Sequence, residues 1–175
     1  GEEGRVFSRH LTDVTESLPE VVEEVREGVA AQEAIVEGEA VALGSDGRPK
    51  PFQHVMRRLR RVKEVAAKSV EEPVKLYLFD VLYLDGRSLV DEPYWRRRKA
   101  LEDAVTGVEL VEAIEATEVG EADEVLRKAL EAGHEGVMVK DPEAPYTPGV
   151  RGRKWLKVKA GPHTLDLVIV AAEYG

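Results

Sequence analysis

The feature that most constrains the fold is a pair of short segments near the C-terminal end of the sequence. Residues 135–140 read Glu-Gly-Val-Met-Val-Lys, and residues 155–159 read Trp-Leu-Lys-Val-Lys. Because strand side chains alternate between two faces, Trp155, Lys157 and Lys159 are expected on one face. Two ammonium groups there suit a phosphate chain, and the carboxylate of Glu135 suits a divalent metal. A lone Lys-x-Lys is more often an exposed edge strand, so the interpretation depends on further motifs.

The length and composition limit the class of protein. A chain of 175 residues can form one domain with a proper core but not two ordinary ones. The absence of cysteine excludes disulfides and zinc–thiolate sites, and the four histidines lie far apart in sequence. No apolar run approaches membrane length and no signal peptide is evident, so we expect a soluble, cytoplasmic protein without a membrane partner. The lack of asparagine and the many charged residues resemble thermophile usage.

The charge distribution is uneven along the chain. The formal net charge is −9, which argues against a uniformly basic surface. Basic residues nevertheless cluster at 57–63, 96–99 and 140–159. Such patches can bind polyanions on an acidic protein, so nucleic acid stays a candidate partner.

The periodicity predicts strands and helices in irregular alternation. Strands are expected at 5–10, 34–43, 74–84, 108–116, 135–140, 155–159 and 165–172, and helices from Ser17 to about Gly28, from Pro51 onward, at 93–105 and at 121–132. Ser17 and Glu20 are expected to form a capping box, and the helix after Pro51 to carry its basic residues on its outer side. With at least one expected hairpin and no glycine-rich phosphate loop, we predict an α+β fold with mainly antiparallel sheets.

Two central strands carry candidate binding groups. Glu37 and Glu39 share a face, which is either exposed or available to a ribose hydroxyl or a metal-bound water. Asp80 falls on a face that is otherwise leucine, so its carboxylate needs hydrogen-bond partners or a functional reason. Alternation puts Phe79 and Val81 on the other face, where Phe79 is either core or a stacking platform for a base.

The order of these motifs resembles the nucleotidyltransferase (adenylation) domain of ATP-dependent DNA ligases, closest to the archaeal and eukaryotic type. The resemblance covers nearly the whole chain. The segments that carry it are 8–15 (Ser-Arg-His-Leu-Thr-Asp-Val-Thr), 36–42, 51–53, 77–86, 92–99, 135–140 and 155–159. It implies the ATP-grasp-like ligase fold, with ATP (as AMP) and Mg²⁺ as cofactors.

The resemblance also implies a reaction and residue roles. In the family a lysine takes AMP from ATP, passes it to the 5′-phosphate of a nick, and a 3′-hydroxyl then displaces it. By motif match, Lys157 and Lys159 would be catalytic on the α-phosphate. Arg9, Glu39, Phe79, Lys140 and Trp155 would bind the nucleotide, and Glu135 and Glu39 would serve the metal. Lys140 fits least well, because it lies five residues from Glu135 and strict alternation puts the two on opposite faces unless the strand bends.

One element of the family pattern does not occur in this sequence. The family nucleophile lies in a Lys-x-Asp-Gly motif, and these 175 residues contain none. We therefore expect residues 1–175 to be a partial nucleotidyltransferase domain, without the N-terminal DNA-binding and C-terminal OB domains, and inactive by itself. Its partners would be nicked double-stranded DNA in the full-length enzyme and a sliding clamp through the absent regions.

Three alternatives stay open from the sequence. An RNA ligase or mRNA-capping guanylyltransferase shares the motif plan, although the Leu-Thr-Asp-Val-Thr and Pro-Phe-Gln segments favour a DNA ligase. A non-catalytic module could bind nucleotide or DNA through the same pocket and basic patches. A plain structural domain would bind neither.

Overall fold

The strands form two separate sheets. The computed structural model describes residues 3–59, 73–149 and 154–159. The first sheet contains β1 (Ala34–Ala42), β2 (Val74–Leu84), β3 (Arg87–Ser88) and β4 (Glu109–Leu110), and the second contains β5 (Gly136–Lys140) and β6 (Trp155–Lys159). All pairs are antiparallel except β2 with β4. The predicted α+β fold with mainly antiparallel sheets is confirmed.

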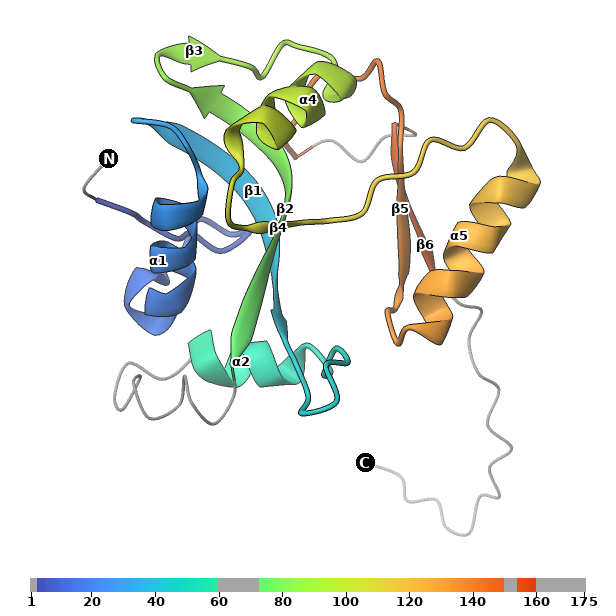
Figure 1. Cartoon of the computed structure of the whole chain (residues 1–175), viewed down its shortest axis with the longest axis horizontal. Helices are drawn as coiled ribbons and strands as arrows, with labels where there is room; N and C mark the ends of the chain where they lie inside the picture. The colour runs from blue at the N-terminus through green and yellow to red at the C-terminus, as the bar shows by residue number, and fades with distance from the viewer. Residues whose placement is uncertain (1–2, 60–72, 150–153, 160–175) are drawn as a thin grey trace, which may run out of the picture.

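The helices cover these sheets on different sides. They are the 3₁₀ turn η1 (Thr15–Ser17), α1 (Pro19–Gly28), α2 (Gln53–Leu59), α4 (Tyr94–Ala104) and α5 (Val119–Glu131). Helices α1 and α4 pack against the first sheet, while α5 lies on the outer side of β5 and β6 (Figure 1). The second sheet therefore stands beside the first, with one face toward it and the other toward α5.

The core lies between β2 and the helices α1 and α4. Leu78 and Val81 of β2 and Leu101 of α4 are fully buried there. The pairing of β1 with β2 skips Phe79, because Gly38 pairs with Leu78 and Glu37 with Asp80. This bulge breaks the alternation. Val81 therefore enters the core, not the face it was predicted to share with Phe79.

Several predicted elements differ from the structure. Residues 5–10 form no strand but contribute a single bridge from Phe7 to Asp13, and the strand predicted at 108–116 is reduced to Glu109–Leu110. The expected capping box at Ser17 is also wrong. Leu18 is the N-cap residue of α1 and makes no side-chain cap hydrogen bond. The strand predicted at 165–172 lies outside the described residues.

Candidate functional site

The inner face of the second sheet carries the basic residues that the sequence singled out. In the pairing of β5 with β6, Met138 lies opposite Lys157, Lys140 opposite Trp155, and Gly136 opposite Lys159. Residues that pair directly across two strands share a face. Lys140 therefore lies on the same face as Trp155, together with both lysines of β6.

Glu135 reaches this face from the residue before β5. Its Oε2 lies 2.9 Å from Nζ of Lys159 and 3.6 Å from Nζ of Lys157. The hydrogen bond from Lys159 holds the pKa of Glu135 below its ordinary value and raises the pKa of Lys159. Strict alternation predicted Glu135 and Lys140 on opposite faces. The structure instead has both on one face, because Glu135 precedes the paired residues and Gly136 redirects the chain.

Gly136 has no substitute in this geometry. Its φ is +155°, and a Cβ atom at this position would lie 2.0 Å from the carbonyl oxygen of Val158. Only a residue without a side chain lets β6 approach this closely. The glycine therefore fixes the start of β5 and, with it, the position of Glu135.

Glu39 brings a second carboxylate toward these charges from β1. It lies opposite Tyr77 in the first sheet. Partial removal from water raises the pKa of Glu39, the neighbouring carboxylate of Glu135 adds to this, and the ammonium of Lys157 opposes it. The two sheets thus bring together Glu39, Glu135, Lys157 and Lys159, four of the candidate residues.

Lys140 lies at the centre of an aromatic cage. Its Nζ is 4.0 Å from the ring centroid of Trp155, 4.4 Å from that of Tyr94 and 4.5 Å from that of Phe79. The nitrogen is buried and has no hydrogen-bond acceptor in the described part of the chain. Burial lowers the pKa of Lys140 to about 8, against the opposing charges of Asp80 and Glu37. Three candidates, Phe79, Lys140 and Trp155, are thus in direct contact.

Tyr94 is a site residue that the sequence indicated only as part of the segment 92–99. It begins α4, and its ring meets Trp155 edge to face, with centroids 5.9 Å apart. The signal available in the sequence was an aromatic residue directly after Pro93, at the start of the helix predicted at 93–105. Nothing in the sequence indicated that the second sheet would supply its neighbours.

The loop between β5 and β6 is fastened to the first sheet and to α4. The backbone N–H groups of Tyr94 and Trp95 donate to the carbonyls of Ala144 (2.9 Å) and Pro142 (3.1 Å). The hydroxyl of Tyr146 donates to the carboxylate of Glu37, and burial together with this bond raises the pKa of Tyr146 to about 12. Glu37 therefore has a structural partner, and this hydrogen bond joins the loop of the second sheet to β1 beside the site.

Two of the predicted basic patches are partly internal. Arg97 is fully buried and forms an ion pair with Asp80, which supplies the partner that Asp80 required. Arg58 is 3% exposed and donates to the carbonyl of Ser17 at 3.0 Å, so α2 does not carry all of its basic residues on its outer side. Neither arginine is available to a polyanion.

Arg9 is separate from the other candidates. It is exposed in the turn between Phe7 and Asp13, and in the residues that the structure covers no hydrogen bond or ion pair joins it to them. Its predicted contact with the nucleotide or with a DNA end stays a prediction.

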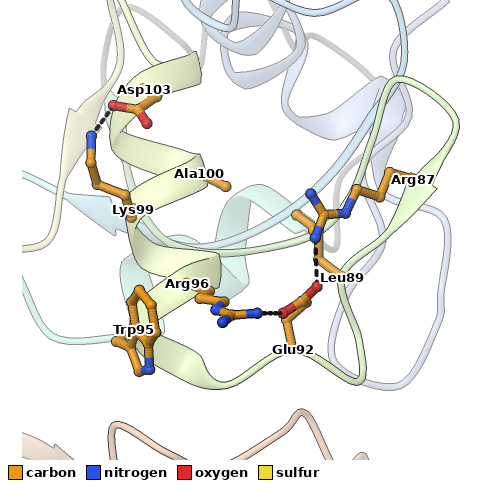
Figure 2. A pocket seen from close by; sticks show the side chains of 8 residues that line it. All are labelled: Arg87, Leu89, Glu92, Trp95, Arg96, Lys99, Ala100 and Asp103. Carbon is orange, nitrogen blue, oxygen red and sulfur yellow. Dashed lines mark hydrogen bonds and ion pairs between the residues drawn. The ribbon is translucent and has the colours of Figure 1, made fainter.

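A shallow pocket of about 250 Å³ lies on the outer side of α4 and has none of the candidate residues in its lining. Figure 2 shows Arg87 and Arg96 pointing to the carboxylate of Glu92, and Lys99 pointing to Asp103. Each cation in this pocket is already paired with a carboxylate. The three cations and two carboxylates leave a net charge of only +1, and none of these cations is unpaired, which does not favour a phosphate there.

Solved structures first define the class of protein. A mycobacterial DNA ligase D complexed with ATP and MES has a TM-score of 0.66 and 28% identity, over 89% of this chain and 47% of that chain. The Chlorella virus DNA ligase–adenylate has a TM-score of 0.59 and 16% identity, over 82% of this chain and 50% of that chain, and so shares the fold. The fold is that of a ligase nucleotidyltransferase domain.

Sequence relatives then identify the family. The sequence profile described as "ATP dependent DNA ligase domain" matches residues 1–159, so the chain belongs to the ATP-dependent DNA ligase family. A DNA ligase of Methanothrix thermoacetophila is 50% identical over 98% of this chain, and one of Thermococcus fumicolans is 49% identical over 97%. The chain spans 31% of the length of each of these relatives. Among the described residues, no helix is long and apolar enough to cross a membrane.

Proposed function

We propose that this chain supplies most of the nucleotide site of an ATP-dependent DNA ligase that seals nicks in double-stranded DNA. The observation that carries the proposal is the convergence of Glu39 from one sheet with Glu135, Lys157 and Lys159 from the other, in a chain of this family. The aromatic ring of Phe79 completes the set as a platform for a base.

The proposed roles follow from the charge and place of each group. The adenine of ATP stacks on Phe79, since an aromatic face binds any base by stacking. The carboxylate of Glu39 accepts a hydrogen bond from the ribose. Lys157 and Lys159 neutralise the α-phosphate, where negative charge builds as the transferring phosphorus is attacked. Arg9, which is exposed, contacts the nucleotide or the DNA end.

The carboxylates of Glu39 and Glu135 also fit Mg²⁺. No group of three or more metal-binding side chains occurs in the part of the chain that the structure covers. Mg²⁺ commonly binds through one or two carboxylates together with substrate phosphates and water, so two carboxylates are sufficient. The pKa of Glu39 is raised mainly by its partial burial and to a smaller extent by the negative charge of Glu135, and a bound cation would favour the ionised form of both carboxylates. When bound, the ion would offset negative charge on the phosphates.

The proposed reaction has three balanced steps. A lysine amine attacks the α-phosphorus of ATP, pyrophosphate leaves, and the amine loses a proton as the lysyl-adenylate forms. An oxygen of the 5′-phosphate at the nick then displaces the lysine amine, which takes up a proton. Finally the 3′-hydroxyl attacks that 5′-phosphate, AMP leaves, and the new phosphodiester forms with loss of the hydroxyl proton.

The test is the intact mass of the protein after incubation with ATP and Mg²⁺. The chain of 175 residues is compared with a form extended upstream until a Lys-x-Asp-Gly motif is included. We expect only the extended form to gain one AMP, and Lys159→Met in that form to abolish the gain. Lys128→Met, at an exposed position on α5, is the matched control and should gain AMP normally.

Two results would contradict the proposal. AMP on the shorter chain would mean that another lysine is the nucleophile and that the motif assignment is wrong. No AMP on either form, with ATP or DNA binding intact, would favour the non-catalytic binding module.

A further inference from the structure

The ammonium of Lys140 is buried without any conventional partner. Trp155, Tyr94 and Phe79 surround its Nζ at 4.0 to 4.5 Å, and these rings come from β6, α4 and β2. Removing a cation from water is unfavourable, and aromatic faces offset only part of that free energy. A methionine of similar length would fill the same space with no charge to bury. The charge itself therefore needs a functional reason.

The nearby carboxylates are already engaged by other groups. Asp80 accepts two hydrogen bonds from Arg97, and Glu37 accepts one from Tyr146. The charged side chains that act on Lys140 are Asp80 of β2, Glu37 of β1, and Arg97 and Arg98 of α4. These are two anions and two cations, of which the anions act more strongly, and the groups in direct contact with the ammonium are the three rings.

We propose that Lys140 is a positioning residue of the nucleotide site, whose ammonium lies on one face of Phe79 and strengthens the stacking of the ATP base on the other face. This inference rests on the proposed function. It assigns to Lys140 a role exerted through Phe79, without contact between the lysine and the base.

The physical basis is the electron distribution of the ring. An aromatic face is negative, so two stacked π systems repel each other where their faces overlap. A cation on the far side draws the π electrons of Phe79 toward itself and lowers this repulsion. The same cation also contacts Tyr94 and Trp155, which fixes its position and the orientation of the platform.

The experiment measures ATP affinity of the complete protein without Mg²⁺ between pH 7 and 9.5, for the wild type, Lys140→Met and Lys140→Arg. Wild-type affinity should fall as the pH rises through about 8, where Lys140 loses its proton. Lys140→Met should bind about tenfold more weakly at pH 7, with no inflection near pH 8. Lys140→Arg should recover most of the affinity and also lack the inflection, because arginine stays charged.

Thermal unfolding separates this role from a structural one. Lys140→Met should unfold at the wild-type temperature or above, because it removes a buried charge. Equal ATP affinity of Lys140→Met and the wild type, or tighter binding by the variant, overturns the inference. Tighter binding of ATP by Lys140→Met would mean that the ammonium occupies the face of Phe79 on which the base stacks. Weak binding by Lys140→Met together with a lowered unfolding temperature and no recovery by Lys140→Arg would assign a packing role instead.

Phe79→Leu distinguishes failure of this inference from failure of the proposed function. If Phe79→Leu weakens ATP binding and Lys140→Met does not, only the role of Lys140 is wrong. If neither variant changes the affinity, the nucleotide does not stack on Phe79 and the proposed site is wrong as well. Lys128→Met serves again as the control for loss of a lysine charge, since this residue is exposed on α5.

Discussion

The guanidinium of Arg97 forms two parallel hydrogen bonds with the carboxylate of Asp80, from Nε to Oδ1 at 2.8 Å and from Nη2 to Oδ2 at 2.9 Å. Neither side chain is exposed. Arg97 also donates to the carbonyls of Glu92 at 2.7 Å and Ala144 at 3.3 Å. One buried cation of α4 thus joins β2, the residues that precede the helix and the loop between β5 and β6.

Breaking this pair should strongly destabilise the protein. Arg97→Met leaves Asp80 buried without its cation, and Asp80→Asn leaves Arg97 without its anion. We expect each variant to lower the free energy of unfolding by about 3 to 5 kcal/mol, as measured by urea denaturation. Arg96→Ala on the same helix breaks an exposed pair with Glu92 and should change it by less than about 1 kcal/mol. Equal effects of the Arg96 and Arg97 substitutions would contradict the burial argument.

Gly136→Ala should disrupt the start of β5. The new methyl group would meet the carbonyl oxygen of Val158, so β5 and β6 have to separate there. We expect a loss of at least about 2 kcal/mol in the free energy of unfolding, together with weaker AMP transfer because Glu135 moves. Gly120→Ala on α5 is the control. A Cβ there meets nothing within 4 Å, and alanine favours a helix, so stability should stay equal or rise by up to about 1 kcal/mol.

Glu135→Gln should separate function from stability at the site. The carboxylate is exposed, and its contacts to Lys157 and Lys159 are surface ion pairs. Such pairs contribute little to folding, so the unfolding temperature should change little. The rate of AMP transfer should fall at least about 100-fold if this group serves the metal and orients the lysines. Glu131→Gln, which breaks a comparable exposed pair with Arg127, should leave that rate unchanged.

The depressed pKa of Lys140 predicts a specific pH dependence of stability. Burial lowers this pKa from the ordinary 10.5 to about 8. Between these pH values the unfolded chain binds more protons at this residue than the folded one, so Lys140 makes the free energy of unfolding rise with pH. Urea denaturation at several pH values from 7.5 to 10.5 measures the slope. Lys140→Met should have a smaller positive slope, and the difference between the two proteins cancels the contributions of other lysines.

Much of the fold follows from local patterns. The predicted strand at 74–84 has the bounds of β2, and both motif strands occur where their alternation indicated. Long apolar runs that end in turn residues determine such strands with little help from distant residues. The strand predicted at 108–116 failed for a tertiary reason. Only Glu109 and Leu110 pair with β2. The N–H of Val111 still donates to the carbonyl of Leu78 at 2.8 Å, and residues 112–116 form no strand.

The candidate site was only partly predictable for a related reason. The sequence indicated Phe79, Glu39, Glu135, Lys157 and Lys159 as separate motifs, and nothing in it showed that Lys140 would lie among Phe79, Tyr94 and Trp155. Those contacts join residues from four elements. They depend on the bulge at Phe79, which breaks the alternation of β2, and on Gly136, which lets β6 approach β5 closely. Local periodicity carries no information about the bulge or about the close approach of the two strands at Gly136.

The sequence by itself determined the strand and helix types, the order of the ligase motifs and the need for a partner of Asp80. The tertiary structure alone decided which basic residues are internal. Arg96 and Arg97 are adjacent and chemically identical, yet one is exposed and the other is fully buried against Asp80. The physical reason is that helical side chains 100° apart face different surroundings, and only the packing of α4 against β2 selects which arginine meets the buried carboxylate.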